Sequence, residues 1–496
     1  MIFDDKGGIF LRGNEIEARL RVLFSDMCDF FIRELTFGKK HLYVAYLTGY
    51  SSRIFINEYI LQPICRAMEG DRLPRPIESV IINAKIESIS EMDAVKKAIL
   101  AGDAVVFGDY MENGIAISVT TKNEDGRSPV EPDTENVIRG AHEGFTESGE
   151  NNAMLIRRRL KTEKLKRRLF PVGTLSSVNV SVMYLEGVAD ARLVEEIIRR
   201  IKDIQTDTIL DSGDVEIWIQ DGKLPLYPTV GNSERPDKVA AKLLEGRVAI
   251  LVDGSPVVLT APYLFLEAFQ VSEDYAKSSW YATFIRSLRF FAYLIALYFP
   301  ALLVALFVRH TALLPEKLIS LITDARETLP FSVFWEVLVI FLIFEAVREV
   351  GLRMPKAVGS AIGFVGSLLL GDSAIKAGIA SAPVLIVVAL AAICNFIVPP
   401  YMNANSLYRF LMIVISGALG LYGFFGGMML SAILLCGKNS FGVPYLSPIA
   451  PIDVAGLGDF LVMIPVFSMR RLPRAITGRR IPRSRGKVWN EKGEPR

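Results

Sequence analysis

The sequence predicts an α/β N-terminal region of two related subdomains, followed by an all-α multipass membrane domain. Three observations predict this division. The first 280 residues are rich in charge and contain no apolar run long enough to cross a bilayer, whereas residues 281–470 contain several. These runs account for a hydrophobic content of 51% and a mean hydropathy of +0.33, which are high for a chain that is soluble throughout. Within the charged part, one pattern of strands and helix occurs twice.

The N-terminal region opens with early acidic residues and without the apolar core of a signal peptide, so we expect it to stay in the cytoplasm. A charged amphipathic helix is predicted around residues 14–35, within a helical segment of residues 1–39. Two α/β subdomains are predicted at residues 40–125 and 165–270, joined by a connector of residues 126–164.

The repeat is visible in two pairs of segments. A strand, a glycine, a short turn and a helix are predicted both in YVAYLTGYSSRIFINEYILQPI, from Tyr43, and in SVMYLEGVADARLVEEIIRRI, from Ser181. Two strands joined by a turn are predicted both in AGDAVVFGDYMENGIAIS, from Ala101, and in EGRVAILVDGSPVVLT, from Glu245. The pattern favours a duplication, and the alternative is a chance likeness between two ordinary strand and helix units.

The connector carries two charged features. One is a set of four residues that form either a site or, as we favour, a charge network at the junction of the subdomains: Glu131, Glu135, Arg139 and Glu143. The other is a dense basic run comprising Arg157, Arg158, Arg159, Lys161, Lys164, Lys166, Arg167 and Arg168. The run is compatible with nucleic acid, anionic lipid or an acidic partner, and equally with a solvated linker surface. We expect no nucleic acid, because no aromatic stacking pattern accompanies the charge.

Residues that build metal and catalytic sites are scarce. No close pair with zinc-ligating spacing occurs among the four cysteines, which we predict to be free thiols: Cys28, Cys65, Cys394 and Cys436. The chain has three histidines and no P-loop, dinucleotide glycine pattern or recognisable nucleophile and base arrangement. We therefore predict no metal, no cofactor and no enzymatic activity.

A transmembrane domain is predicted over residues 281–437. Three stretches without Lys, Arg, Asp or Glu are long enough to span, namely 290–308, 377–398 and 411–437. The last is longer than a span needs and carries glycines at 417, 420, 423, 426 and 427, so we expect it to be bent or closely packed. A basic tail of residues 438–496 follows, and its arginines predict a cytoplasmic location by the positive-inside rule.

If both ends are cytoplasmic, the number of crossings is even, and a fourth crossing is expected between Arg309 and Lys376. One candidate is residues 331–350, whose acidic residues and Arg348 also suit an interfacial helix or one buried against protein. The other is AVGSAIGFVGSLLLG, residues 357–371, which is uncharged but would form a helix of only ~22 Å against a hydrocarbon core of ~30 Å.

Several long motifs resemble the A subunits of GerA-type spore germinant receptors. They are EPDTENVIRGAHEGFTE at 131–147, AMLIRRRL at 153–160, ERPDKVAAKLLEGRVAILVDGSP at 234–256, IRSLRF at 285–290, EAVREVGLRMPKAVGSAIGFVGSLLLGDSAIKAG at 345–378, GLYGFF at 420–425 and SFGVPYLSP at 440–448. The resemblance covers about residues 100–470. The first motif is also similar to the sporulation paralogue SpoVAF, and the family's PFPP is replaced by PFSV at 330–333.

The resemblance implies a multipass protein of the spore inner membrane that works in germination. It implies a receptor with a transporter-like B subunit and a lipoprotein C subunit, in which A subunits form a ring that acts as a nutrient-gated ion channel. A SpoVAF-like amplifying channel is one alternative. A secondary transporter and a membrane-anchored scaffold are others.

In such a ring, residues 357–371 suit the pore. Small residues recur at every fourth position and would let neighbouring backbones approach: Gly359, Gly363, Ser367 and Gly371. Val365 and Leu368 would form an apolar constriction, and Asp372 a ring of carboxylates at one mouth. The competing interpretation of the small residues is plain helix packing.

Overall fold

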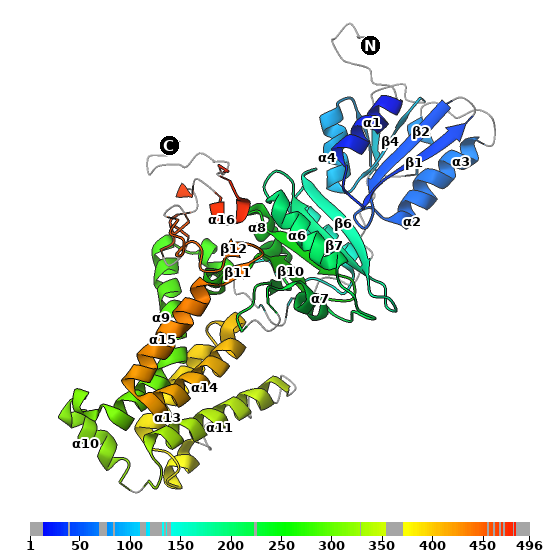
Figure 1. Cartoon of the computed structure of the whole chain (residues 1–496). Coiled ribbons are helices and arrows are strands. Elements are labelled where there is room, and N and C mark those ends of the chain that lie inside the picture. The colour runs from blue at the N-terminus through cyan, green and yellow to red at the C-terminus, as the bar shows by residue number, and fades with distance from the viewer. Residues whose placement is uncertain are drawn as a thin grey trace. The chain divides into compact units, whose positions relative to one another are not determined.

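A computed structural model of the chain describes residues 13–37, 40–68, 77–82, 85–109, 116–119, 131–132, 135, 140–222, 226–327, 329–353, 371–453, 456–459, 462–465, 468–469, 472–479 and 481–482. The chain forms two compact units (Figure 1). An α/β unit comprises Met1–Lys223, Val230–Pro262 and Arg471–Pro482, and a helical unit comprises Leu224–Thr229, Tyr263–Arg470 and Arg483–Arg496.

The first part of the α/β unit is a five-stranded antiparallel sheet in the order β1-β2-β4-β5-β3. Its strands are β1 (Phe30–Phe37), β2 (Lys40–Leu47), β3 (Ile86–Ile89), β4 (Ala104–Gly108) and β5 (Ala116–Val119). Its helices are α1 (Gly13–Leu23), α2 (Arg53–Phe55), α3 (Gln62–Met68) and α4 (Met92–Ala101), with a π-helical segment Ile56–Leu61 between α2 and α3.

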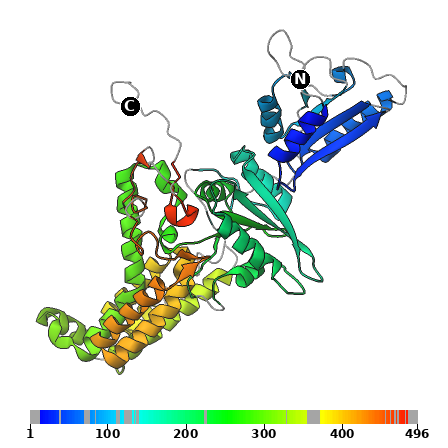
Figure 2. The ribbon, with the colours of Figure 1, turned by 45° about the horizontal axis from the view of Figure 1, so that its top comes forward.

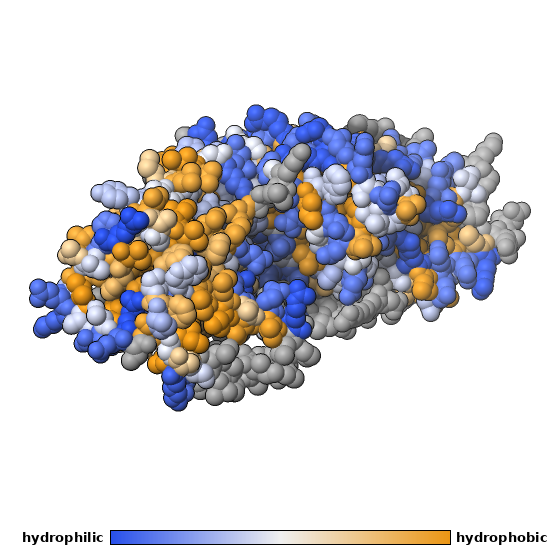
Figure 3. All heavy atoms as spheres, turned by 60° about the horizontal axis from the view of Figure 1, so that its bottom comes forward, coloured by the Kyte–Doolittle hydropathy of each residue, from blue (hydrophilic) through white to orange (hydrophobic). Residues whose placement is uncertain are grey.

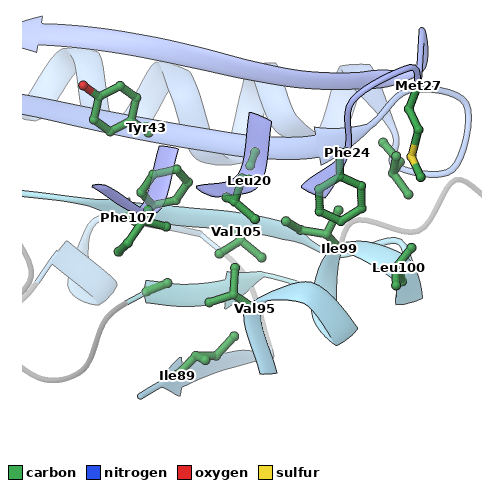
Figure 4. Packing of buried hydrophobic residues seen from close by; sticks show 14 of the residues in the cluster. Leu20, Phe24, Met27, Tyr43, Ile89, Val95, Ile99, Leu100, Val105 and Phe107 are labelled. Carbon is green, nitrogen blue, oxygen red and sulfur yellow. The ribbon is translucent and has the colours of Figure 1, made fainter. Parts of the chain in front are cut away.

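Both faces of this sheet are covered. Val105 of β4 lies in a core with residues of α1 and α4. Figure 4 shows Leu20 and Phe24 close to Val105 and Ile99 in this core. The neighbouring Val106 points to the opposite face, where the π-helical segment and α3 pack. Successive side chains of a strand alternate between faces, so a central strand covered on both sides is apolar throughout.

The second part repeats this topology in the order β6-β7-β9-β10-β8. Its strands are β6 (Leu165–Val172), β7 (Val178–Leu185), β8 (Gly231–Ser233), β9 (Val248–Val252) and β10 (Val258–Ala261). Its helices are α5 (Gly149–Arg159), α6 (Ala191–Lys202), α7 (Ser212–Ile219) and α8 (Pro236–Leu244). The strands of the predicted repeat occupy equivalent places, since β2, β4 and β5 correspond to β7, β9 and β10, and this confirms the repeat.

The helix predicted around residues 14–35 is wrong beyond Leu23. α1 buries Ile16 and Leu20 on one face, as an amphipathic helix should, and then ends. Asp26 takes a positive φ of 59°, and β1 begins at Phe30 and pairs with β2. The aromatic and branched residues at the start of β1 favour a strand, so the predicted helical segment of residues 1–39 also supplies a strand to the first sheet.

The helical unit contains α9 (Ser279–Arg309), α10 (Glu316–Asp324), α11 (Val333–Arg353), α13 (Ala382–Asn395), α14 (Met402–Leu419) and α15 (Leu421–Cys436). α9 packs against α13, α14 and α15, and Figures 1 and 2 show these helices side by side. An aromatic cluster packs near the start of α14, where the Tyr401 hydroxyl donates to the Phe265 carbonyl at 2.6 Å. A two-stranded ribbon of β11 (Asn439–Ser440) and β12 (Val443–Pro444) also belongs to this unit.

The described helices support fewer spans than the sequence predicts. α9 is long and apolar enough to cross a membrane and contains the predicted span 290–308. A second candidate exists if α13 and the segment Pro399–Leu419 are counted together, although they are bent by 112° at the break of residues 396–398, directly before Pro399 and Pro400. Multipass topology is therefore not established by the part of the chain that the structure describes.

The predicted single span at residues 411–437 is wrong. The chain turns at Gly420, so that α14 and α15 lie against each other as two helices. Gly423 lies so close to α14 that a Cβ there would meet the Ile415 carbonyl oxygen at 2.5 Å. The expected bend and close packing are confirmed, and the bend is a complete break.

Candidate functional site

The predicted pore residues Gly359, Gly363, Val365, Ser367 and Leu368 lie outside the described residues. Gly371 and Asp372 lie in the helical residues 371–376. The Asp372 carboxylate accepts a hydrogen bond from Lys376 Nζ at 2.6 Å, and its side chain is 57% exposed.

The four charged residues of the connector do not form one described cluster. Arg139 lies outside the described residues, Glu131 contacts His142 Nδ1 at 2.8 Å, and Glu143 contacts Arg159 at 2.7 Å. Glu135 accepts hydrogen bonds from Ser233 Oγ and Lys238 Nζ, each at 2.5 Å. Burial acts to raise the pKa of Glu135, but Lys238 and these hydrogen bonds hold that pKa below its ordinary value.

The basic run is partly internal to the α/β unit. Arg157 donates from Nε and Nη2 to the two carboxylate oxygens of Asp29 at 2.7 and 2.8 Å, and both side chains are 3% exposed. Lys166 Nζ donates to the carbonyls of Leu23 and Ser25 at 3.3 and 2.8 Å. These buried bonds join residues next to α1 and β1 to the second sheet, so Arg157 and Lys166 do not belong to an exposed basic surface.

The described residues of the helical unit form three polar clusters, which place charged side chains among apolar helices. The first lies where α9 begins, and Asp274 accepts hydrogen bonds from Arg286 at 3.1 Å and from Arg289 at 2.7 Å. Arg286 also contacts Asp459 at 2.8 Å. Burial acts to raise the pKa of Asp274, and the arginines hold that pKa below its ordinary value.

The second cluster joins α11 to the start of α13. Glu336 is buried and accepts hydrogen bonds from the backbone N–H and the hydroxyl of Ser381, each at 2.5 Å. Its other oxygen accepts from Arg326 Nε at 3.1 Å. Ser381 is the N-cap of α13, so the carboxylate stabilises a helix N-terminus, where negative charge is favoured.

The third cluster, here the Glu345 cluster, comprises Glu345, Arg348, Ser406 and Arg409 on α11 and α14. Glu345 accepts from Arg409 Nη2 at 3.0 Å and from Ser406 Oγ at 2.9 Å through one oxygen. Its other oxygen contacts Arg348 Nη2 at 2.7 Å. Arg348 Nη1 also donates to Ser406 Oγ at 2.6 Å, so these bonds fix α11 against α14.

Two asparagines extend the Glu345 cluster to α13. Asn405 Nδ2 donates to Asn395 Oδ1 at 3.1 Å, and Asn395 Nδ2 donates to the Met402 carbonyl at 3.2 Å. Asn395 is the last residue of α13 and Met402 the first of α14, so the bonds bridge the break between the two helices. Polar groups inside apolar helices mark functional positions, since an unpaired polar group costs several kcal/mol in lipid.

The sequence interpretation noted the charges of α11 but missed Arg409. The signal was present, because Arg409 is the single charge between residues 377 and 437. Among the described residues, no group of three or more His, Cys, Asp or Glu side chains could hold a metal ion. The clusters can hold helices in register or line a polar path between them.

Comparison with known proteins finds similarity to spore germination proteins over most of the chain. A family model described as "Bacillus/Clostridium GerA spore germination protein" matches residues 18–475. Spore germination protein KA of Bacillus subtilis is 36% identical over 90% of this chain and 84% of that protein. Stage V sporulation protein AF of B. subtilis is 32% identical over 90% of this chain and 91% of that protein, and the uncharacterised membrane protein YfkQ is 36% identical over 92% and 89%.

Similarity also extends to a solved structure. It is the N-terminal domain of the A subunit of the Bacillus megaterium spore germinant receptor GerK3, which aligns with 52% of this chain and 97% of that chain. The sequence identity is 28% and the TM-score 0.41.

Proposed function

Because the chain belongs to the GerA family of spore germination proteins, we propose that it is the membrane-embedded A subunit of a spore germination receptor. The proposed location is the spore inner membrane, with the N-terminal region and the C-terminal tail in the cytoplasm. The proposed partners are a transporter-like B subunit, a lipoprotein C subunit and further copies of this chain. Together the copies form a ring that acts as a nutrient-gated ion channel, whose opening releases ions and ends dormancy.

The distribution of side chains over the helical unit supports a membrane setting. Hydrophobic residues gather on this unit in Figure 3, and the exposed ones include Phe291, Phe299, Leu342, Ile386, Ile393 and Phe425. Glu336 and Arg409 are buried between the helices. Lipid favours exposed apolar side chains and inward-facing, paired charges, whereas water favours the reverse.

The pore is proposed to consist of residues 357–371 from each copy. The small residues at four-residue spacing let neighbouring backbones approach, and Val365 and Leu368 form an apolar constriction that excludes water. Asp372 supplies a ring of carboxylates, which favours cations. Nutrient binding elsewhere in the receptor tilts or rotates this segment and wets the constriction.

Substitution in the constriction tests the channel. Val365→Ala and Leu368→Ala widen it, so spores carrying either variant should release ions or germinate without nutrient. Ile386→Ala is the matched control, because it shortens a side chain that is exposed on α13. If both pore variants leave spores as dormant as the control, the constriction is wrongly assigned.

A second candidate function is a SpoVAF-like channel that amplifies germination after other receptors have responded. The extent of the match to stage V sporulation protein AF favours it. Deletion of the B and C subunits distinguishes a receptor subunit from an amplifying channel. Without these partners, a receptor subunit loses all response to nutrient, whereas an amplifying channel still contributes to germination triggered by other receptors.

A secondary transporter is a further candidate, favoured by the bend of 112° between α13 and the segment Pro399–Leu419 beside buried polar groups. Transport by the purified protein separates the two mechanisms. A transporter moves substrate and ion in a fixed ratio, whereas a channel passes ions without such coupling.

A further inference from the structure

The Glu345 cluster carries one more positive charge than negative charge. The guanidinium groups of Arg348 and Arg409 both contact Glu345, which is the one carboxylate of the cluster in the described part of the chain. The neighbouring residues 354–370 contain no Asp or Glu. That segment therefore cannot supply the missing negative charge, whatever its position.

Three buried polar atoms of the cluster have no hydrogen-bond partner among the described residues. They are Arg348 Nε, Arg409 Nε and Asn405 Oδ1. The Arg409 side chain is 2% exposed and Asn405 is fully buried, so bulk water does not form hydrogen bonds with their unpaired atoms. An unpaired donor on a buried charged group is costly, and native proteins rarely keep two in one cluster.

The surroundings of Arg409 increase this cost. Its guanidinium lies next to a core of apolar side chains from α9, α11, α13 and α14. The Phe341 ring, whose centre is 5.1 Å away, makes a favourable cation–π contact with the charge but accepts no hydrogen bond from Nε. Buried ion pairs are stable when each charge is matched and each hydrogen bond is made. Here Glu345 already accepts from three donors, namely Arg348, Arg409 and Ser406.

We propose that the Glu345 cluster binds a singly charged anionic group, which accepts hydrogen bonds from the Nε groups of Arg348 and Arg409. The group is a small anion from solution, such as a halide or a short carboxylate, or the headgroup of an anionic lipid. Either source balances the charge and satisfies both donors. Arg348 and Glu345, whose side chains are 16% and 20% exposed, are the members of the cluster that reach the surface. The site would exist in a channel, a transporter or a scaffold, so it does not depend on the proposed function.

Thermal unfolding of the full chain in a neutral detergent tests the site. At constant ionic strength, bromide or acetate replaces a bulky organic sulfonate, and we expect a saturable rise in Tm. Arg348→Gln and Arg409→Gln should each raise the half-saturating anion concentration at least about tenfold, which matches the loss of one charge-assisted hydrogen bond. Arg353→Gln is the control, because Arg353 is an exposed arginine on the same helix.

A second variant separates anion binding from a merely structural role. Glu345→Gln removes the internal carboxylate and leaves the Arg348 and Arg409 guanidinium groups without a negative partner in the cluster, so bromide should raise the Tm of this variant by more than it raises that of the natural protein. If the arginines serve only to hold α11 against α14, this variant is equally unstable in both anions.

A further experiment with lipids identifies the source of the anionic group. If bromide and acetate have no effect but phosphatidylglycerol stabilises the chain relative to phosphatidylcholine, and Arg409→Gln abolishes that difference, the ligand is a lipid headgroup. If neither solution anions nor phosphatidylglycerol give an effect that depends on Arg348 and Arg409, the proposal is wrong.

Discussion

Arg157 shows how a residue of an apparently exposed basic run becomes internal. The sequence reveals the density of charge in the run, but it does not reveal that Asp29, 128 positions earlier, lies opposite Arg157. A two-point contact with a carboxylate matches the charge of the arginine and satisfies two of its donors, and a third donates to the Leu165 carbonyl at 3.1 Å, so the burial is tolerable. The basic run could therefore be predicted, whereas its burial could not.

Loss of this contact should destabilise the α/β unit. Arg157→Gln leaves the Asp29 carboxylate buried without its charge partner, and we expect a loss of about 3–5 kcal/mol in the free energy of unfolding. Arg53→Gln is the matched control, because the Arg53 and Glu150 side chains are exposed and such pairs contribute below about 1 kcal/mol. Urea unfolding of the purified chain measures both, and equal losses would contradict the assigned role.

Glu135 should make stability depend on pH in the acidic range. Its pKa is lowered in the folded chain, so its stabilising contribution is complete above the unfolded pKa of about 4.5 and is lost as pH falls below it. The Glu135→Gln variant should therefore be less stable than the natural protein at pH 7. Near pH 3, the difference in the free energy of unfolding between the two proteins should be smaller. Urea midpoints at the two pH values measure this, and a constant difference would exclude the linkage.

At the scale of the elements, the repeat of the α/β unit was predictable from sequence. Each copy places a glycine between a strand and a helix and has strands with continuous apolar runs, and both features are present in the folded sheets. Two predictions, the helix around residues 14–35 and the single span at residues 411–437, were wrong because one or a few residues end a helix within a longer helical or apolar pattern. A turn near Asp26 ends the helix before β1, and Gly420 divides an apolar stretch of spanning length into α14 and α15.

The turn at Gly420 should tolerate no side chain. Its φ of 63° and ψ of −141° lie in a region that is essentially restricted to glycine, and a Cβ would meet the His310 ring at 2.8 Å. We expect Gly420→Ala to cost about 1–3 kcal/mol from backbone strain. Gly426→Ala is the control, because Gly426 is helical with open space around it, and it should stabilise α15 by about 0.5–1 kcal/mol. Thermal unfolding in detergent compares the two, and an equal response would show that the turn is not a constraint.

At the scale of the whole molecule, the charged clusters of the helical unit were only half visible in the sequence. Arg409 stands out as a lone charge in apolar sequence, but its partner Glu345 lies 64 positions away on another helix. Contacts between distant helices depend on packing, which local patterns do not encode. The pore residues at 359–368 remain a prediction from sequence, since they lie outside the described residues.

The central claim is that several copies of this chain assemble around a shared pore. The most direct test is the mass of the detergent-purified complex, measured alone and with its B and C subunits. We expect a closed oligomer that Gly363→Leu dissociates, because a large side chain prevents the close approach of backbones. Gly351→Leu is the control and should leave the oligomer intact, because the space around Gly351 is open. A monomer under all conditions would contradict the channel.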